Sequence, residues 1–156
     1  MTVGIRRATP ADYLAALRSR GPQGESGGLS LDCGYFLAEQ DGHLVGCLGW
    51  RAENLVARLE DLRLAQTASA LQNEALAALL GAVDAAAGEL ECEVALLALP
   101  APDTEIMGPA LQAQGYARVT PEDLPRHHRE AAEEMTPQGQ ALWARRLRQT
   151  RVTRPL

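Results

Sequence analysis

Apolar and polar positions alternate along five stretches of the chain, and a period of two is typical of β-strands with one buried face. These stretches cover residues 3–8, 35–40, 43–51, 55–64 and 90–99. A helix is also compatible with the pattern at 55–64, but we favour a strand there. Asp41-Gly42 supplies the two positive φ angles of a tight turn, which predicts a hairpin over 35–51. The continuous apolar half of 90–99 indicates a central strand.

A helical spacing of three and four replaces the alternation elsewhere. Apolar residues at positions 71, 75, 76, 79, 80 and 83 predict a helix over 69–87, ended by Gly88. Thr9 and Pro10 are typical of a helix start, so a helix is expected over 9–20. Two further helices are expected at 103–114, ended by Gly115, and at 121–135, where the sequence is polar enough for a surface helix.

Short elements complete the predicted fold. Tyr116 and Val119 belong to a short strand, and residues 140–152 fit either a strand or a helix, of which we favour the strand. The resulting order is strand, helix, three strands, helix, strand, helix and strand, with a helical insertion before a final strand. It predicts one domain over 1–156 of the α/β (α+β) class, with a mixed, mostly antiparallel sheet of six to seven strands flanked by helices.

Composition narrows the class of protein. Of the 156 residues 46% are hydrophobic and 22% charged, as in globular domains, and the longest apolar run is too short to span a bilayer. The N-terminus lacks a signal-peptide pattern, so a cytoplasmic location and no membrane association are expected. Cys33, Cys47 and Cys92 are too far apart for a disulfide framework or a zinc site, and buried or half-buried thiols are expected instead.

Charge is unevenly distributed. The net charge is −5, yet the C-terminal segment 145–156 carries five arginines and no acidic residue. Such a segment can bind nucleic acid. The acidic remainder of the chain, however, repels polyanions and can itself bind the basic segment. We therefore favour an intramolecular or solvated role, and nucleic acid is an unlikely partner.

Four stretches, in this order, carry a family resemblance: IRRATPADY at 5–13, YFLAEQDGHLVGCLGWR at 35–51, the strand-to-helix passage at 62–80, and ALQAQGYARV at 110–119. In order and spacing they resemble the GNAT superfamily of N-acetyltransferases over nearly the whole chain. The resemblance implies a sheet that splays between its fourth and fifth strands, with acetyl-CoA or another acyl-CoA as co-substrate in the opening and no metal.

The resemblance also implies where the cofactor lies. The pantetheine arm would run along the end of the fourth strand, at Leu62 and Leu64. The pyrophosphate would rest on the following turn, where the first N–H groups of a helix lack partners. That turn comprises Thr67, Ala68, Ser69, Ala70, Leu71 and Gln72. The family's glycines are absent from it, and the alternative is that Ser69 only caps a core helix.

Glu60 and Asp61 are the candidate catalytic bases, because the reaction must take a proton from an ammonium. Strict alternation would turn only one of them into the opening. The alternative is that both are exposed and pair with Arg58 and Arg63. Leu111 stands where many family members carry a proton-donating tyrosine. His43, His127 and His128 are expected on the solvated surface, and Trp50 and Tyr35 in the core or in the wall of the opening.

Two functions of different classes follow from the resemblance. The first is an acyltransferase that moves an acetyl or other acyl group directly from CoA to the amine of a small molecule or peptide, and the family allows a homodimer. The second is a GNAT-like fold that has lost catalysis and serves as a binding or scaffold module.

Overall fold

The computed structural model describes residues 3–7, 33–65, 68–136 and 140–147. In chain order the elements are β1 (Gly4–Arg7), β2 (Cys33–Gln40), β3 (His43–Glu53), β4 (Val56–Leu64), α2 (Ser69–Glu89), β5 (Val94–Pro100), α3 (Ala101–Ala113), β6 (Ala117–Val119), the 3₁₀ turn η1 (Pro121–Asp123), α4 (Arg126–Met135) and β7 (Gln140–Arg146). The expected helix over 9–20 lies outside the described residues.

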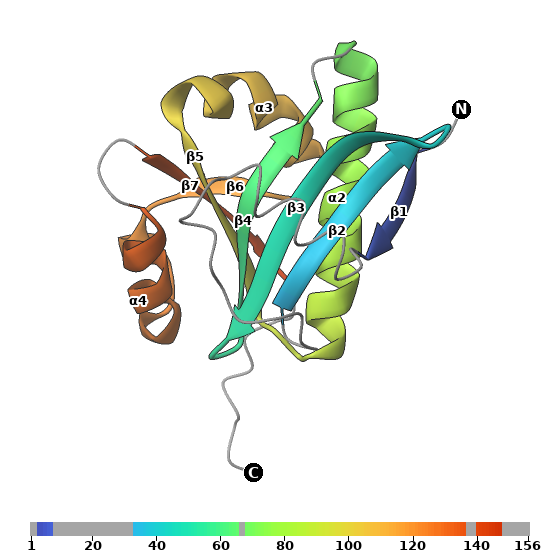
Figure 1. The fold of residues 1–156 in the computed structure, drawn as a ribbon. Coiled ribbons are helices and arrows are strands. Elements are labelled where there is room, and N and C mark those ends of the chain that lie inside the picture. The colour runs from blue at the N-terminus through green and yellow to red at the C-terminus, as the bar shows by residue number, and fades with distance from the viewer. Residues whose placement is uncertain (1–2, 8–32, 66–67, 137–139, 148–156) are drawn as a thin grey trace, which may run out of the picture.

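All seven described strands join one sheet in the order β1-β2-β3-β4-β5-β7-β6. Only β4 and β5 run parallel, and every other neighbouring pair is antiparallel. Helix α2 provides the crossover that a parallel pair requires. The prediction of a mixed, mostly antiparallel sheet flanked by helices is confirmed (Figure 1).

Two tight turns set the register of the central strands. Asp41 and Gly42 have φ angles of 53° and 81°, so the predicted hairpin between β2 and β3 is confirmed. A second turn, at Asn54 and Leu55, joins β3 to β4 with φ angles of 55° and 68°. Leucine rarely adopts a positive φ, which is why the sequence does not mark this second turn.

Helices cover both faces of the sheet. On one face α2 and α3 enclose the larger apolar cluster, which includes Leu48, Trp50, Leu76 and Leu111. On the other face α4 covers a smaller cluster around Val56 and Leu96. At the end of α4, Arg58 of β4 forms ion pairs with Glu53 and Glu134 at 3.0 and 2.8 Å.

Several predicted boundaries are wrong. Helix α2 continues through Gly88 to Glu89 and is followed by Glu91 at φ 62°, so the turn after it, rather than the glycine, ends it. The strand expected from residue 90 starts at Val94. The helix expected over 121–135 is interrupted at Pro125, whose ring lacks the N–H that a continuous helix needs.

The remaining elements agree with expectation in type. Gly115 follows α3 with φ 91°, the left-handed angle of a glycine after a helix end. The final segment is a strand as far as Arg146, and residues 148–152 lie outside the described part. Trp50 is buried in the core, Cys92 is buried and Cys47 is half-buried.

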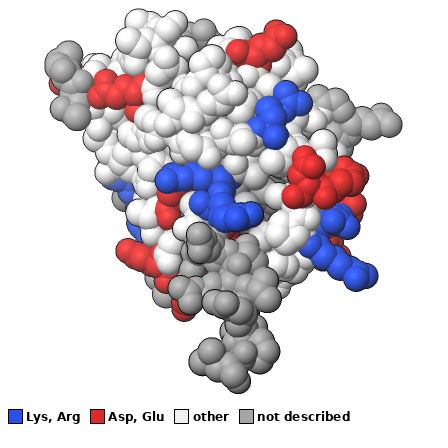
Figure 2. Space-filling view, turned by 180° about the vertical axis from the view of Figure 1, so that it is seen from behind, with Lys and Arg blue, Asp and Glu red and all other residues white. Residues whose placement is uncertain are grey.

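The surface and the helices carry two further observations. In the part of the chain that the structure describes, every helix is too short or too polar to cross a bilayer. Seen from behind, arginine and carboxylate side chains lie next to one another rather than in separate areas of one sign (Figure 2). One arginine of the basic segment, Arg145, forms an ion pair with Asp84 of α2, as an intramolecular role predicts.

Candidate active site

Strands β4 and β5 pair over only part of their length. The ladder joins Val56–Leu59 to Val94–Leu97 and stops there. Beyond it, Glu60, Arg63 and Leu64 pair with β3 alone, while Ala98–Pro100 pair with β7 alone. The two strands diverge in Figure 1, and the predicted splay between the fourth and fifth strands is confirmed. Backbone groups of β4 beyond Leu59 therefore have no pairing partner on β5.

A β-bulge lies on β4 directly where the splay begins. Cys47 pairs with Arg63 and Gly49 with Glu60, so β3 advances two residues while β4 advances three. Asp61, inside the bulge, has a φ of 57°. A bulge leaves one residue out of the ladder and re-aims the strand. Aspartate tolerates the left-handed region better than most residues, which fits its place here.

The bulge changes where the two candidate carboxylates point. Leu59 belongs to the apolar cluster under α2 and Leu62 packs against it, although the two are three residues apart. Glu60 and Asp61 lie between these two leucines in the sequence, and neither belongs to the core cluster. The unbroken alternation assumed from the sequence therefore does not hold here, and which of the two carboxylates turns toward the splay stays a prediction.

Asp61 is held by a tyrosine from a strand two positions away. The Tyr35 hydroxyl of β2 donates a hydrogen bond of 2.6 Å to Oδ2 of Asp61, and both residues are half-buried. Tyr35 follows the alternation of β2, in which its neighbour Phe36 belongs to the core cluster, so the tyrosine projects from the opposite face. The expectation that Tyr35 belongs to the wall of the opening fits this contact.

Glycine at position 49 makes the contact across β3 feasible. A Cβ there would lie 3.1 Å from the Glu60 carbonyl oxygen and 3.1 Å from the Tyr35 ring. Any larger residue would therefore push the ring away from Asp61. Tyr35, Gly49 and Asp61 lie on three adjacent strands, with the glycine between the other two. We call the hydrogen-bonded residues Tyr35 and Asp61 the Tyr35–Asp61 pair.

The alternative pairing of the carboxylates with Arg58 and Arg63 is wrong for Arg58, which pairs with Glu53 and Glu134 instead. Glu60 and Arg63 are both exposed. The described contacts therefore separate the two candidates: Asp61 is oriented by a neighbour, and Glu60 stands at the surface.

The start of α2 supplies the second half of the candidate site. Ala68 is the N-cap residue and Ser69 the first helical residue, so Ser69 is not the cap. Ala68, Ser69 and Ala70 are exposed, and the first turn of α2 contains no acidic residue. Its first N–H groups lack intrahelical partners and lie at the positive end of the helix dipole. An anion can approach this end of the helix without meeting a like charge in its first turn.

Gln72 braces the passage from strand to helix. Its side-chain Nε2 donates a hydrogen bond of 2.8 Å to the Ala65 carbonyl, across residues 66–67. The bulky side chain is thereby tied to the end of β4. Leu71, Leu62 and Leu64 are half-buried and pack against the core cluster. Thr67 lies outside the described residues.

Position 111 contributes no proton donor. Leu111 is fully buried in the core, and the nearest tyrosine in the sequence, Tyr116, is buried as well. The Tyr116 hydroxyl donates to Asp84 at 3.1 Å, and Asp84 also pairs with Arg145. Burial raises the pKa of Tyr116 well above its ordinary value and raises the pKa of Asp84, although the Arg145 charge opposes both shifts. This group links α2 to β7 through the Asp84–Arg145 ion pair.

A second polar cluster, at the opposite end of β5, was not predicted from sequence. His128 is only 2% exposed, so the expectation of a solvated histidine is wrong for it. Nε2 of His128 lies 2.9 Å and Nε2 of His127 2.8 Å from the same oxygen, Oε1 of Glu93. Burial lowers the pKa of His128, and the hydrogen bond from His127 is the main cause that lowers the pKa of Glu93. The only feature of the sequence that pointed to this cluster was the pair of adjacent histidines in a predicted polar helix.

No protein-family model matches the chain, and no curated protein sequence matches it either. Solved structures do match. A GNAT-family acetyltransferase from Staphylococcus aureus Mu50 is 13% identical, with a TM-score of 0.62, over 94% of this chain and 100% of that one.

Two other matches are enzymes of stated activity. The ribosomal-protein-S18-alanine N-acetyltransferase from Escherichia coli is 13% identical, with a TM-score of 0.63, over 99% of this chain and 100% of that one. The PaiA N-acetyltransferase from Thermoplasma acidophilum, in complex with coenzyme A, is 12% identical, with a TM-score of 0.61, over 94% and 99%. The chain therefore has the fold of the GNAT acetyltransferases, as its sequence predicted.

Proposed function

We propose that this chain is an acyl-CoA-dependent N-acyltransferase. The observation that carries the proposal is the coincidence of three features along one strand: the end of the β4–β5 ladder after Leu59, the bulge at Glu60 and Asp61, and the exposed start of α2 that follows. Each has a role in binding or activating a thioester. One of the matching structures is a complex with coenzyme A, which supports an acyl-CoA as the co-substrate of a protein with this fold.

In this proposal the pantetheine arm lies along the free edge of β4 at Leu62 and Leu64, like an additional strand. The pyrophosphate rests at the start of α2, on the N–H groups of Ala68 to Leu71. Backbone amides replace the family's glycine loop, and the Ser69 hydroxyl adds a hydrogen bond. Acetyl-CoA is the first candidate because the matching enzymes are acetyltransferases.

Asp61 acts as the general base. An incoming ammonium loses a proton to the Asp61 carboxylate, directly or through one water, and the free amine attacks the thioester carbonyl carbon. A backbone N–H of the bulge stabilises the negative charge that develops on the carbonyl oxygen. The attacking nitrogen loses its second proton to water as the C–S bond breaks, and the CoA thiolate takes a proton from solvent, since Leu111 offers none. Tyr35 is a positioning residue that fixes the Asp61 carboxylate.

The experiment is a thiol-release assay with acetyl-CoA and a panel of small amines and N-terminal peptides. Asp61→Asn should lower kcat by about 10² to 10⁴, the usual contribution of a general base, with the KM for acetyl-CoA unchanged. Glu60→Gln is the matched control, one residue away with the same loss of charge, and should retain activity. Loss in Glu60→Gln but not in Asp61→Asn would overturn the assignment of the base.

A second candidate, a GNAT-fold binding module without catalysis, rests on two specific observations. Position 111 holds a buried leucine and the start of α2 has no glycine, so two features of active family members are missing. Binding of acetyl-CoA without turnover for any amine would favour this candidate. A cytoplasmic location, a homodimer and a role for the basic segment 145–156 stay predictions from the sequence.

A further inference from the structure

The cluster of Glu93, His127 and His128, which we call the β5–α4 cluster, brings three ligand-type side chains together. One ligand atom from each residue lies within 4.8 Å of the other two. Both imidazoles direct Nε2 at Oε1 of Glu93, and the two rings are 4.0 Å apart between centroids with a tilt of 52°. Among the residues described, this is the one such group of three or more His, Cys, Asp or Glu.

The backbone of Glu93 is held at two points. The Glu93 N–H donates to the Leu55 carbonyl at 2.7 Å, and the Glu93 carbonyl accepts from the Leu147 N–H at 2.9 Å. The residue is thereby held between the turn before β4 and the end of β7. His127 and His128 lie in the first turn of α4. The cluster thus joins a helix start to a strand start, at positions set by the fold.

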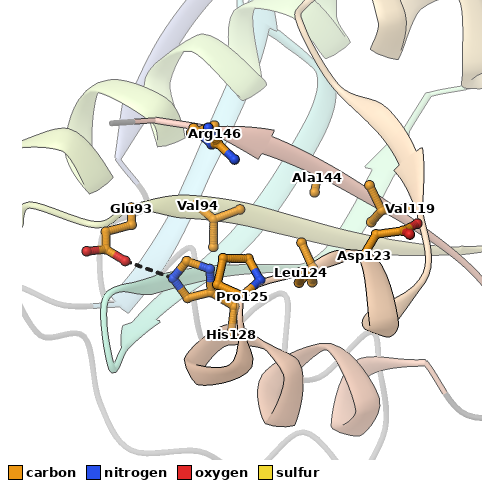
Figure 3. A pocket seen from close by; sticks show the side chains of 9 residues that line it. All are labelled: Glu93, Val94, Val119, Asp123, Leu124, Pro125, His128, Ala144 and Arg146. Atoms are coloured by element: carbon orange, nitrogen blue, oxygen red, sulfur yellow. Dashed lines mark hydrogen bonds and ion pairs between the residues drawn. The ribbon is translucent and has the colours of Figure 1, made fainter. Parts of the chain in front are cut away.

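One ligand is buried and another is accessible. His128 is 2% exposed, and its ring lies at one end of a pocket of about 190 Å³ that Glu93 and Pro125 also line. His127 is 51% exposed. Figure 3 shows Glu93 and His128 turned toward each other, with Arg146 entering from β7 on another side of the pocket. Two ligands are therefore pre-placed, while His127 leaves one side open to solvent.

Two imidazoles and one carboxylate form a donor set that suits Zn²⁺, which binds nitrogen at 2.0–2.1 Å and carboxylate oxygen at 2.0–2.2 Å. In a tetrahedral site such ligands lie about 3.3 Å apart. The observed separations of 2.8 and 2.9 Å from nitrogen to oxygen are those of hydrogen bonds and need to open by about 0.5 Å. The ligand atoms of the two histidines lie within 4.8 Å of each other and need to close by up to about 1.5 Å. Rotations of the exposed His127 and of the Glu93 carboxylate supply these changes.

We propose that Glu93, His127 and His128 bind Zn²⁺, with water as the fourth ligand. In each ring the proton moves from Nε2 to Nδ1, and the Nε2 lone pair binds the ion in place of the hydrogen bond to Glu93. It ties the first turn of α4 to the start of β5, at the end of β5 opposite the splay, so its role is structural and independent of acyl transfer.

The surroundings set the expected affinity. Nδ1 of His128 is buried and has no hydrogen-bond partner in the described structure, so a metal-bound His128 would carry an N–H without an acceptor. The nearby Arg146 also opposes a cation. We therefore expect a dissociation constant in the micromolar range rather than the tighter values of closed structural sites.

The test is calorimetric titration of the full, tag-free and chelator-treated protein with ZnCl₂, together with thermal unfolding. Wild type should bind one equivalent and unfold at a higher temperature with Zn²⁺. His127→Ala and Glu93→Gln should each weaken binding more than about tenfold and lose the thermal shift. His43→Ala, an exposed histidine on β3, is the matched control and should behave like wild type.

Three results would overturn the site. The first is the absence of any binding heat and thermal shift at millimolar Zn²⁺. The second is Zn²⁺ binding that His127→Ala and Glu93→Gln leave unchanged, and the third is Zn²⁺ binding that Cys47→Ser abolishes. Substitution with Co²⁺ gives a second readout: visible bands of a tetrahedral site without a thiolate charge-transfer band are expected, and that band would contradict the ligand set.

Discussion

The Tyr35 hydroxyl reaches across strand β3 to Oδ2 of Asp61, at 2.6 Å, and meets it at the residue where β4 bulges. The contact joins β2 to β4 at the point where the sheet starts to splay. A carboxylate fixed in this place is oriented before any substrate arrives, and we expect acyl transfer to depend on that orientation.

Removing the tyrosine hydroxyl tests the pair directly. Tyr35→Phe leaves the ring and removes only the donor, so the protein should fold while the Asp61 carboxylate loses its orientation. A hydrogen bond to a charged group contributes about 1.5 kcal/mol, which corresponds to about a tenfold fall in kcat. Steady-state kinetics with saturating acetyl-CoA measure it. Unchanged kcat in a well-folded variant would show that Tyr35 has no positioning role.

Gly49 is expected to tolerate no side chain. In Gly49→Ala the new Cβ would lie 3.1 Å from the Glu60 carbonyl and from the Tyr35 ring, so the protein should lose about 1–3 kcal/mol of unfolding free energy and much of its activity. Gly81→Ala is the matched control. Nothing lies within 4 Å of a Cβ at this position inside α2, and alanine should add about 1 kcal/mol. Denaturant unfolding of both variants measures these changes in unfolding free energy. Equal changes in Gly49→Ala and Gly81→Ala would contradict the steric account.

A negative charge at the start of α2 should separate ligand binding from helix stability. Ala70→Glu places a carboxylate in the first turn, which favours the helix through its dipole but repels a pyrophosphate. We expect acetyl-CoA to bind at least about fivefold more weakly while the unfolding temperature holds or rises. Ala85→Glu, exposed near the other end of α2, carries the same charge and should bind normally. Identical affinities in both variants would place the phosphates elsewhere.

Tyr116 predicts a loss of stability at high pH. Burial raises its pKa well above the ordinary 10.0, so the folded state keeps the phenol protonated where the unfolded state ionises it. The stabilising contribution is therefore complete below pH 10 and is lost as the pH rises through the folded-state pKa. Denaturant unfolding between pH 9 and about 12 should show this loss in wild type and much less of it in Tyr116→Phe. Parallel curves would contradict the assignment.

The sequence predicted the sheet because its signals are local. Alternation in β2, β3 and β4, the Asp41-Gly42 turn and the three-and-four spacing of α2 each depend on residues close together in the chain. Helix ends were less predictable, since Gly88 is compatible with a helix interior and the turn at Glu91 depends on packing. Pro125 interrupts the helix expected over 121–135. This break could have been predicted, because proline lacks the N–H that a continuous helix needs.

The site was predictable only in part. The position of Glu60 and Asp61 on β4 followed from the pattern, but the bulge that breaks their alternation depends on pairing with β3. Tyr35 and Asp61 are 26 positions apart, and Glu93 and His128 are 35 apart, so neither contact leaves a local signal. His128 was expected at the surface because its neighbours on α4 are polar, yet it shares a buried face with Ala131 and Ala132.

Thermal unfolding with and without acetyl-CoA tests the central claim most directly, because it asks whether the opening beside β4 binds a CoA ester. At a hundred times its dissociation constant a ligand adds about 2.7 kcal/mol, which raises the unfolding temperature by roughly 5–10 °C in a domain of this size. We predict such a rise with acetyl-CoA and CoA and none with ATP. An unchanged midpoint with every CoA ester, or an equal rise with ATP, would contradict the acyltransferase account.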